Sequence, residues 1–129
     1  MSGQSEIIER YSGRKFHWRD CNCWELTRAV WREVAGVDLP FDTPQEISAS
    51  SISLAVGRAL NKALDSGLLT ECAYTSPALA LFTGRHVSPH GGVVLNGLLL
   101  HVTPFTHVSH DPVGLVMEKG EFNQVRYFR

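Results

Sequence analysis

The sequence has few cysteines, no long apolar run and no excess of charge of either sign. Its 129 residues include three cysteines, Cys21, Cys23 and Cys72, and this odd number argues against a disulfide framework. No apolar run approaches the ~18 residues that a membrane-spanning helix needs, so no membrane insertion is expected. The formal net charge is −1 and the basic residues are scattered, so we expect no binding of nucleic acid.

The first residues also lack the features of a secretory signal. Residues 1–6 contain neither a basic n-region nor an apolar h-region, so we expect that no Sec-type signal directs export. The composition does offer 43% hydrophobic residues within a length that is typical of one domain. We therefore expect a single domain over residues 1–129.

Hydrophobic periodicity divides the chain into a helical first half and a strand-rich second half. Helices are expected at residues 5–11, 22–34 and 52–64, and strands at residues 78–82, 91–95, 98–102, 113–117 and 124–128. This segregation indicates an α+β fold, in which N-terminal helices pack on a small antiparallel sheet.

The helix expected at residues 22–34 carries a cysteine in its first turn. An apolar stripe at helical spacing includes Cys23 and Leu26, and either Asp20 or Asn22 can cap the helix start. Partial positive charge at a helix N-terminus favours a thiolate, so we expect a lowered pKa for Cys23. A thiolate facing an imidazole is the usual arrangement for acyl transfer by cysteine, although Cys23 alone fits a buried core thiol better.

The strongest local signal is the Asn96-Gly97 dipeptide between two apolar runs, which predicts a two-residue type I′ hairpin turn. In that register His101 lies opposite Gly92. His90 precedes Gly92 by two residues and so points to the same face, which makes the two imidazoles diagonal neighbours. One histidine can then act as a base while the other fixes its tautomer, whereas a pair of solvent-facing strand histidines is the alternative.

The same region contains the ligand types of a tetrahedral zinc site, which are Cys21, Cys23, His90 and His101. The Cys-x-Cys spacing is tighter than usual for zinc. The two thiols also diverge in direction where the helix begins. We therefore expect no metal ligand among these residues, and acyl transfer by cysteine needs neither a metal nor an organic cofactor.

Three stretches of the sequence, at residues 22–40, 90–102 and 125–129, resemble the NlpC/P60 cysteine peptidases, most closely the phage tail-assembly members. Residues 22–33 read Asn-Cys-Trp-Glu-Leu-Thr-Arg-Ala-Val-Trp-Arg-Glu, and Gly-Val-Asp-Leu-Pro follows at residues 36–40, as in the family's nucleophile helix. His-Gly-Gly-Val-Val at residues 90–94 and Leu-Leu-His-Val at residues 99–102 resemble its histidine hairpin. Residues 125–129 are similar to the closing strand of the phage members.

This resemblance implies a papain-like fold and an endopeptidase that cuts an amide bond in peptidoglycan stem peptides. It implies Cys23 as the nucleophile, His90 as the base and His101 as the orienting residue. Family members also place an aromatic residue near the oxyanion site, ahead of the cysteine.

We expect the substrate-binding residues to be His17, Trp18 and Trp24, because they surround the nucleophile in the sequence. Tyr11, His17 and Trp18 are all candidates for the aromatic or polar residue at the oxyanion site.

The sequence departs from the family pattern beside the nucleophile. The family's aspartate is Asn22, the small residue two positions after the cysteine is Glu25, and the hairpin is one residue shorter. A register at Asp20-Cys21 restores the aspartate but takes the cysteine off the apolar stripe, so Cys23 is preferred. Near a cleft, the carboxylate of Glu25 is expected to raise the thiol pKa or to hinder an acidic substrate.

The resemblance also implies a place in a phage virion. The protein would be made in the host cytoplasm, contact other tail tip proteins, and be delivered by the tail to the host cell envelope. The alternative, favoured by Asn22 and Glu25, is a structural tail-tip subunit that keeps the fold with little or no hydrolase activity. A third interpretation is an amidase or acyltransferase of the same fold.

Overall fold

The computed structural model describes residues 3–129. Met1 and Ser2 lie outside the described residues, although the expected domain and the segment without signal features both begin with them. The helices are α1 (Gln4–Tyr11), α2 (Cys23–Ala35), α3 (Ala49–Asp65) and α4 (Val113–Lys119). The strands are β1 (Glu71–Cys72), β2 (Ala78–Thr83), β3 (His90–Leu95), β4 (Leu98–His101), β5 (Ser109–Asp111) and β6 (Gln124–Phe128). No helix of this described part is long and apolar enough to span a bilayer.

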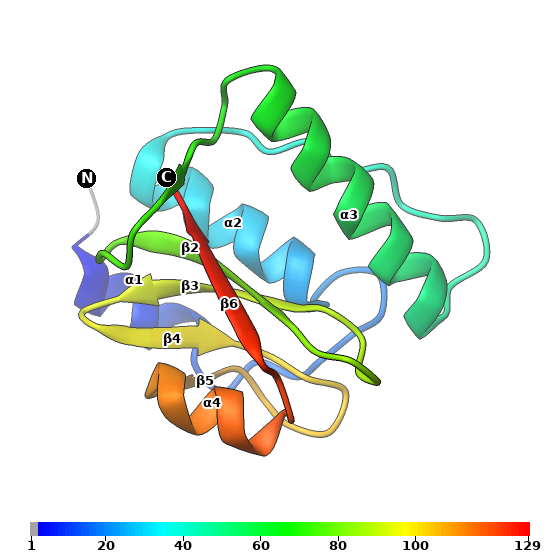
Figure 1. The fold of residues 1–129 in the computed structure, drawn as a ribbon. Coiled ribbons are helices and arrows are strands. Elements are labelled where there is room, and N and C mark those ends of the chain that lie inside the picture. The colour runs from blue at the N-terminus through cyan, green and yellow to red at the C-terminus, as the bar shows by residue number, and fades with distance from the viewer. Residues whose placement is uncertain (1–2) are drawn as a thin grey trace.

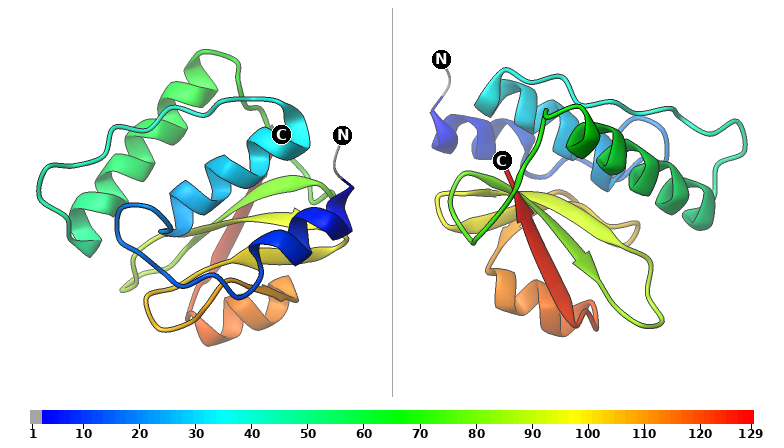
Figure 2. Two further views of the ribbon diagram at one scale, coloured as in Figure 1. Left: turned by 180° about the vertical axis from the view of Figure 1, so that it is seen from behind. Right: turned by 45° about the horizontal axis from the view of Figure 1, so that its top comes forward.

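The strands form one antiparallel sheet with helices on both faces. Its order is β1-β6-β2-β3-β4-β5, and all neighbouring strands run antiparallel to each other. Helices α1, α2 and α3 cover one face, and α4 lies against the other (Figures 1 and 2). The expectation of an α+β fold with N-terminal helices on an antiparallel sheet is therefore confirmed.

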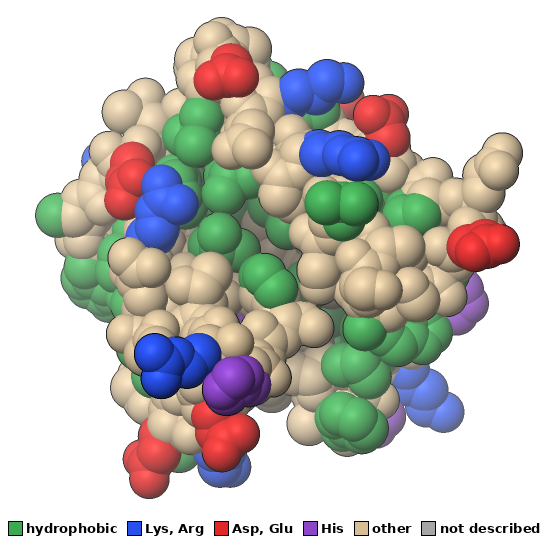
Figure 3. All heavy atoms as spheres, turned by 45° about the vertical axis from the view of Figure 1, so that its right-hand side comes forward, with side chains coloured by type: hydrophobic (Ala, Val, Ile, Leu, Met, Phe, Trp, Pro, Cys, Tyr) green, Lys and Arg blue, Asp and Glu red, His purple; other side chains and the backbone are tan. Residues whose placement is uncertain are grey.

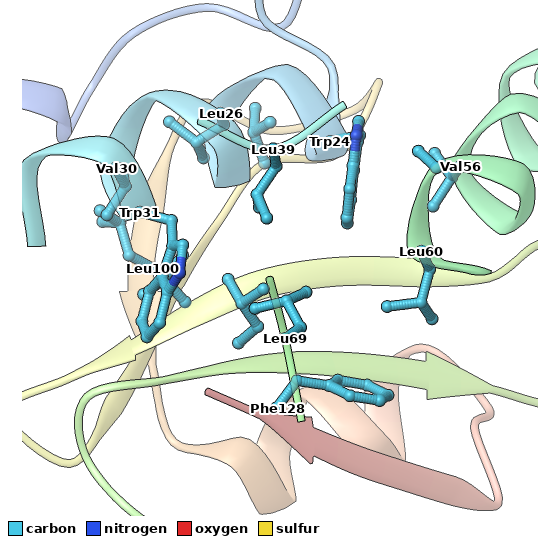
Figure 4. Close-up of a cluster of buried hydrophobic side chains, with 14 of the residues drawn as sticks. Trp24, Leu26, Val30, Trp31, Leu39, Val56, Leu60, Leu69, Leu100 and Phe128 are labelled. Atoms are coloured by element: carbon cyan, nitrogen blue, oxygen red, sulfur yellow. The ribbon is translucent and has the colours of Figure 1, made fainter. Parts of the chain in front are cut away.

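Alternation of side chains along the strands explains why the apolar runs are buried on both sides. Val93 packs into the core beneath α1–α3, whereas its neighbour Val94 packs into the cluster beneath α4. Leu100 and Leu99 of β4 divide between the faces in the same way. Figure 4 shows the larger core, where the tryptophans of α2 approach side chains of α3 and the sheet.

The ends of α2 follow from two residues. The side-chain oxygen of Asn22 accepts hydrogen bonds from the backbone N–H groups of Trp24 and Glu25, at 3.0 and 2.9 Å. Asn22, and not Asp20, is therefore the N-cap. Gly36 ends the helix in the left-handed conformation at φ 69°.

The predicted hairpin turn is confirmed. Asn96 and Gly97 have φ values of 49° and 82°, as a type I′ turn requires, and Leu95 pairs with Leu98. Because Val93 pairs with Leu100, the next residue of β4, His101, lies beside Gly92, as the sequence predicted.

The strand predicted at residues 113–117 is wrong, because this segment forms α4. The residues that pack against the sheet from it are Val113, Val116 and Met117, at helical rather than alternating spacing. Helix α3 also begins earlier than expected, since Ser48 and Ser51 form a capping box. The sequence analysis did not predict the short strands β1 and β5.

Candidate active site

A cavity of about 870 Å³ lies where β3 begins and β4 ends. The N-terminal ends of α2 and α3 contribute to one part of its wall, and α4 contributes to another. Cys23, His90 and His101 all line it. The structure therefore brings the expected nucleophile, base and orienting residue to one site.

Cys23 is the first residue of α2 and is half-buried. Burial raises the pKa of Cys23, although the backbone N–H groups of Gly91, Trp24 and Cys23 itself act on the sulfur and lower it. The lowered pKa that the sequence suggested is therefore wrong, because loss of water outweighs the charge of the helix end. At neutral pH Cys23 is a thiol.

His90, His101 and Asp111 form a hydrogen-bonded series, which we call the histidine row. Nε2 of His90 lies 2.8 Å from Nδ1 of His101, and Nε2 of His101 lies 2.8 Å from a carboxylate oxygen of Asp111. Ser109 donates a hydrogen bond of 2.7 Å to the same oxygen. The predicted contact between the two imidazoles is confirmed, and a carboxylate extends it.

The protonation states of the row follow from its surroundings. Burial, with a smaller effect of His101, lowers the pKa of His90 to about 3. Burial also lowers the pKa of His101, although Asp111 opposes this. Partial burial raises the pKa of Asp111, but hydrogen bonds from Ser109 and His101 outweigh it and hold the value below the ordinary one. At pH 7 two neutral imidazoles therefore lie beside a carboxylate.

These states fix the positions of the protons along the row. The carboxylate of Asp111 can only accept, so Nε2 of His101 carries its proton and Nδ1 is an acceptor. Nε2 of His90 must then donate to His101, which leaves Nδ1 of His90 with a free lone pair. Among residues 3–129, no hydrogen bond is made by this Nδ1 atom. The row thus prepares His90 as a base at Nδ1.

Neighbouring aromatic rings and a glycine hold the two imidazoles in place. The ring of Phe122 stacks on His90 at 5.9 Å and 9°, and Phe82 lies 6.0 Å away. A side-chain carbon at Gly92 would come within 3.1 Å of Cβ of His101. Gly92 therefore keeps the space between the histidines open, as its position in the hairpin suggested.

Asp111 was not predicted from the sequence as a residue of the site. The residue lies in β5, whose pairing sets Ser109 opposite His101 and Asp111 diagonal to it on the same face. The sequence did offer one signal: Ser109 and Asp111 are two positions apart, and this spacing places both side chains on one face of a strand.

Of the residues expected to border the substrate, the structure brings only Trp18 to the cavity. Trp18 is 39% exposed, and its ring meets Phe16, a lining residue that was not predicted, edge-on at 4.9 Å. His17 is exposed outside the lining, and its Nδ1 accepts hydrogen bonds from backbone N–H groups at residues 19 and 20. Trp24 is a core residue whose indole N–H donates to the carbonyl of Pro40.

The remaining candidates also lie away from the cavity wall. Tyr11 is buried, and its hydroxyl donates to Glu33. Glu25 pairs with Arg28 at 2.7 Å, and it is not among the groups that shift the pKa of Cys23. Glu25 therefore does not contribute to the pKa of Cys23, and its effect on an acidic substrate stays a prediction.

The other cysteines take no part in the cavity. Cys21 forms an isolated β-bridge with His17, and Cys72 lies in β1. Within the described residues, no group of three or more His, Cys, Asp or Glu side chains is placed to hold a metal ion.

A comparison with protein-family models finds no match to this chain, and a comparison with curated proteins finds no significant one.

Proposed function

We propose that the protein is a cysteine hydrolase of the NlpC/P60 type, with a papain-like fold, that cleaves an amide bond in peptidoglycan stem peptides. The observation that supports this most strongly is the histidine row. Its proton positions leave a free lone pair on His90 at the cavity that Cys23 lines. A base oriented by a second polar group, beside a nucleophile, is the general pattern of covalent acyl transfer.

The chemistry follows from the neutral ground state. Nδ1 of His90 accepts the thiol proton as the sulfur of Cys23 attacks the carbonyl carbon. The side chain of Asn22 occupies the N–H groups of Trp24 and Glu25, so we assign the oxyanion to the N–H of Cys23, which faces its own sulfur before substrate binds. His90 then gives its proton to the leaving amine, and water hydrolyses the thioester.

The rest of the histidine row stabilises the charge that forms on His90. When the imidazole takes the thiol proton, its Nε2–H remains bonded to His101, and His101 remains bonded to the carboxylate of Asp111. Stabilisation of a transient imidazolium by such a carboxylate is the role of the third group in catalytic triads.

The test is mass spectrometry of peptidoglycan fragments incubated with the purified protein. We expect new stem-peptide fragments that are absent with Cys23→Ser and retained with Cys21→Ser, the matched control that also tests the other register. If fragments appear in no sample across several pH values, the peptidase function is refuted.

A structural subunit with little or no hydrolase activity is the second candidate. It is supported by the raised thiol pKa of Cys23 and by the absence of a hydrogen bond between Cys23 and His90 within residues 3–129. Under either candidate, the resemblance supports a place in a phage tail tip, with delivery by the virion to the host cell envelope. Co-purification of the protein with intact virions, compared with host lysate, tests that location.

A further inference from the structure

The cavity that holds Cys23 has a mainly apolar wall. Aromatic and aliphatic side chains reach it from the loop before α2, from α3, from the loop after β4, from α4 and from the turn before β6. The principal ones are Phe16, Trp18, Ile52, Phe105, Leu115 and Phe122. Figure 3 shows hydrophobic side chains gathered around a hollow on the side of the molecule that it presents. A ligand that fills this space buries apolar surface.

The polar side chains of the wall are mostly bonded to other protein groups. Asn22 caps α2, Thr103 bonds to Thr106 at 2.9 Å, and Ser109 donates within the histidine row. Among residues 3–129, Lys119 is the only lysine or arginine that lines the cavity. An apolar part of a substrate therefore loses no hydrogen bonds to water when it lies against this wall.

The mouth of the cavity carries exposed aromatic rings. Phe105 is 94% exposed and Trp18 is 39% exposed, and they stand on different loops of the lining. Large apolar side chains that remain in water beside a concave apolar site are typical of surfaces that receive an apolar ligand. The cavity and these rings therefore favour the same class of ligand.

We propose that Cys23 accepts an apolar acyl group from an ester and transfers it to water, an activity that goes beyond amide cleavage but rests on the same proposed nucleophile. The sulfur of Cys23 forms a bond to the acyl carbon while the ester C–O bond breaks, and His90 carries the thiol proton to the departing alkoxide. Water then attacks the thioester, the C–S bond breaks, and the proton returns to the sulfur. The products are an alcohol, a carboxylic acid and the free thiol.

The first test compares kcat/KM for p-nitrophenyl acetate, butyrate, hexanoate and octanoate, each used below its micelle concentration. We expect kcat/KM to rise by about fourfold for each added methylene that the cavity buries, and all turnover to vanish in Cys23→Ser. Turnover that depends on Cys23 but is flat or falls with chain length would overturn the proposal and leave the hydrolase function intact. Peptidoglycan cleavage without Cys23-dependent turnover of any ester would overturn it in the same way. If neither substrate is turned over in a Cys23-dependent way, both proposals fail.

The second test asks whether the aromatic rings at the mouth of the cavity contact the acyl chain of the ester. Phe105→Ser changes an almost fully exposed side chain, so the fold is kept, and we expect the ratio of octanoate to acetate turnover to fall by about threefold or more. Leu68→Ser is the matched control, because Leu68 is 42% exposed and lies outside the lining. Equal ratios in the two variants would show that the aromatic mouth does not bind the acyl group and would refute the proposal.

Discussion

Gly92 and Gly91 are neighbours in β3, but only Gly91 has room for a side chain. A Cβ atom at Gly92 would lie 2.7 Å from the carbonyl oxygen of Leu100 and 3.1 Å from Cβ of His101. At Gly91 the nearest atom would be the carbonyl oxygen of Ala80, at an ordinary 3.7 Å. We therefore predict that Gly92→Ala destabilises the fold and that Gly91→Ala does not.

The two substitutions share one favourable effect and differ in one unfavourable effect. Alanine reduces the conformational freedom of the unfolded chain in both variants, which stabilises each by about 0.4–1 kcal/mol. In Gly92→Ala the clash involves the backbone of β4, which is fixed by its pairing with β3, and relieving such overpacking costs about 1–3 kcal/mol. The free energies of unfolding should thus differ by about 1–3 kcal/mol, and the midpoint temperatures by roughly 3–15 °C for a chain of this size.

Urea and thermal unfolding of the two variants measure this difference directly. Because Gly92→Ala also displaces the β-carbon of His101, we expect it to lower any Cys23-dependent turnover as well. Equal free energies of unfolding in the two variants would refute the register that brings the two histidines together.

Four further predictions concern individual side chains. Asp111→Asn should lower kcat by about 10²–10⁴-fold, because an amide can donate to the adjacent imidazole and reverse the proton positions; turnover of the esters measures it. The rate of Cys23 alkylation by iodoacetamide should have its midpoint above the ordinary pKa of a cysteine thiol, because burial raises the thiol pKa; a midpoint below that ordinary value in the mass-spectrometric time course would contradict this. The free energy of unfolding should fall as pH drops from about 6.5 towards 3, because the unfolded chain protonates His90 and the folded protein does not; His90→Gln should flatten this slope in urea titrations. Trp24→Phe should cost about 1–2 kcal/mol more than Trp31→Phe, because only the indole N–H of Trp24 has a partner, as equilibrium unfolding can show.

The parts of the fold that were predicted correctly have local causes. The turn at Asn96-Gly97 follows from two residues that accept positive φ, and α2 follows from its apolar stripe and its cap at Asn22. The strand predicted at residues 113–117 was wrong because valines favour strands, whereas the residues of this segment that are buried in the fold have helical spacing. Strands β1 and β5 have only two and three residues, so no periodicity marks them and their pairing partners define them.

The candidate site also has one part that local sequence predicts and another that depends on contacts between distant segments. Side-chain alternation sufficed to place His90 beside His101, because both flank a turn whose register is local. Asp111 joins them only through the pairing of β4 with β5, which depends on a connection that the sequence does not describe. The pKa of Cys23 was predicted in the wrong direction because it depends on burial by residues far away in the sequence.

The neutral state of the site has a consequence for how it would react. Because burial keeps both Cys23 and His90 uncharged, no ion pair has to be desolvated when a substrate enters the cavity. An apolar acyl group that displaces water leaves these two groups in their preferred states. In the proposed reaction, charge would develop only as the sulfur attacks, when the carboxylate of Asp111 could stabilise the imidazolium of His90 through His101. Under the proposed mechanism, the apolar wall would act on substrate binding and the carboxylate of Asp111 on the transition state.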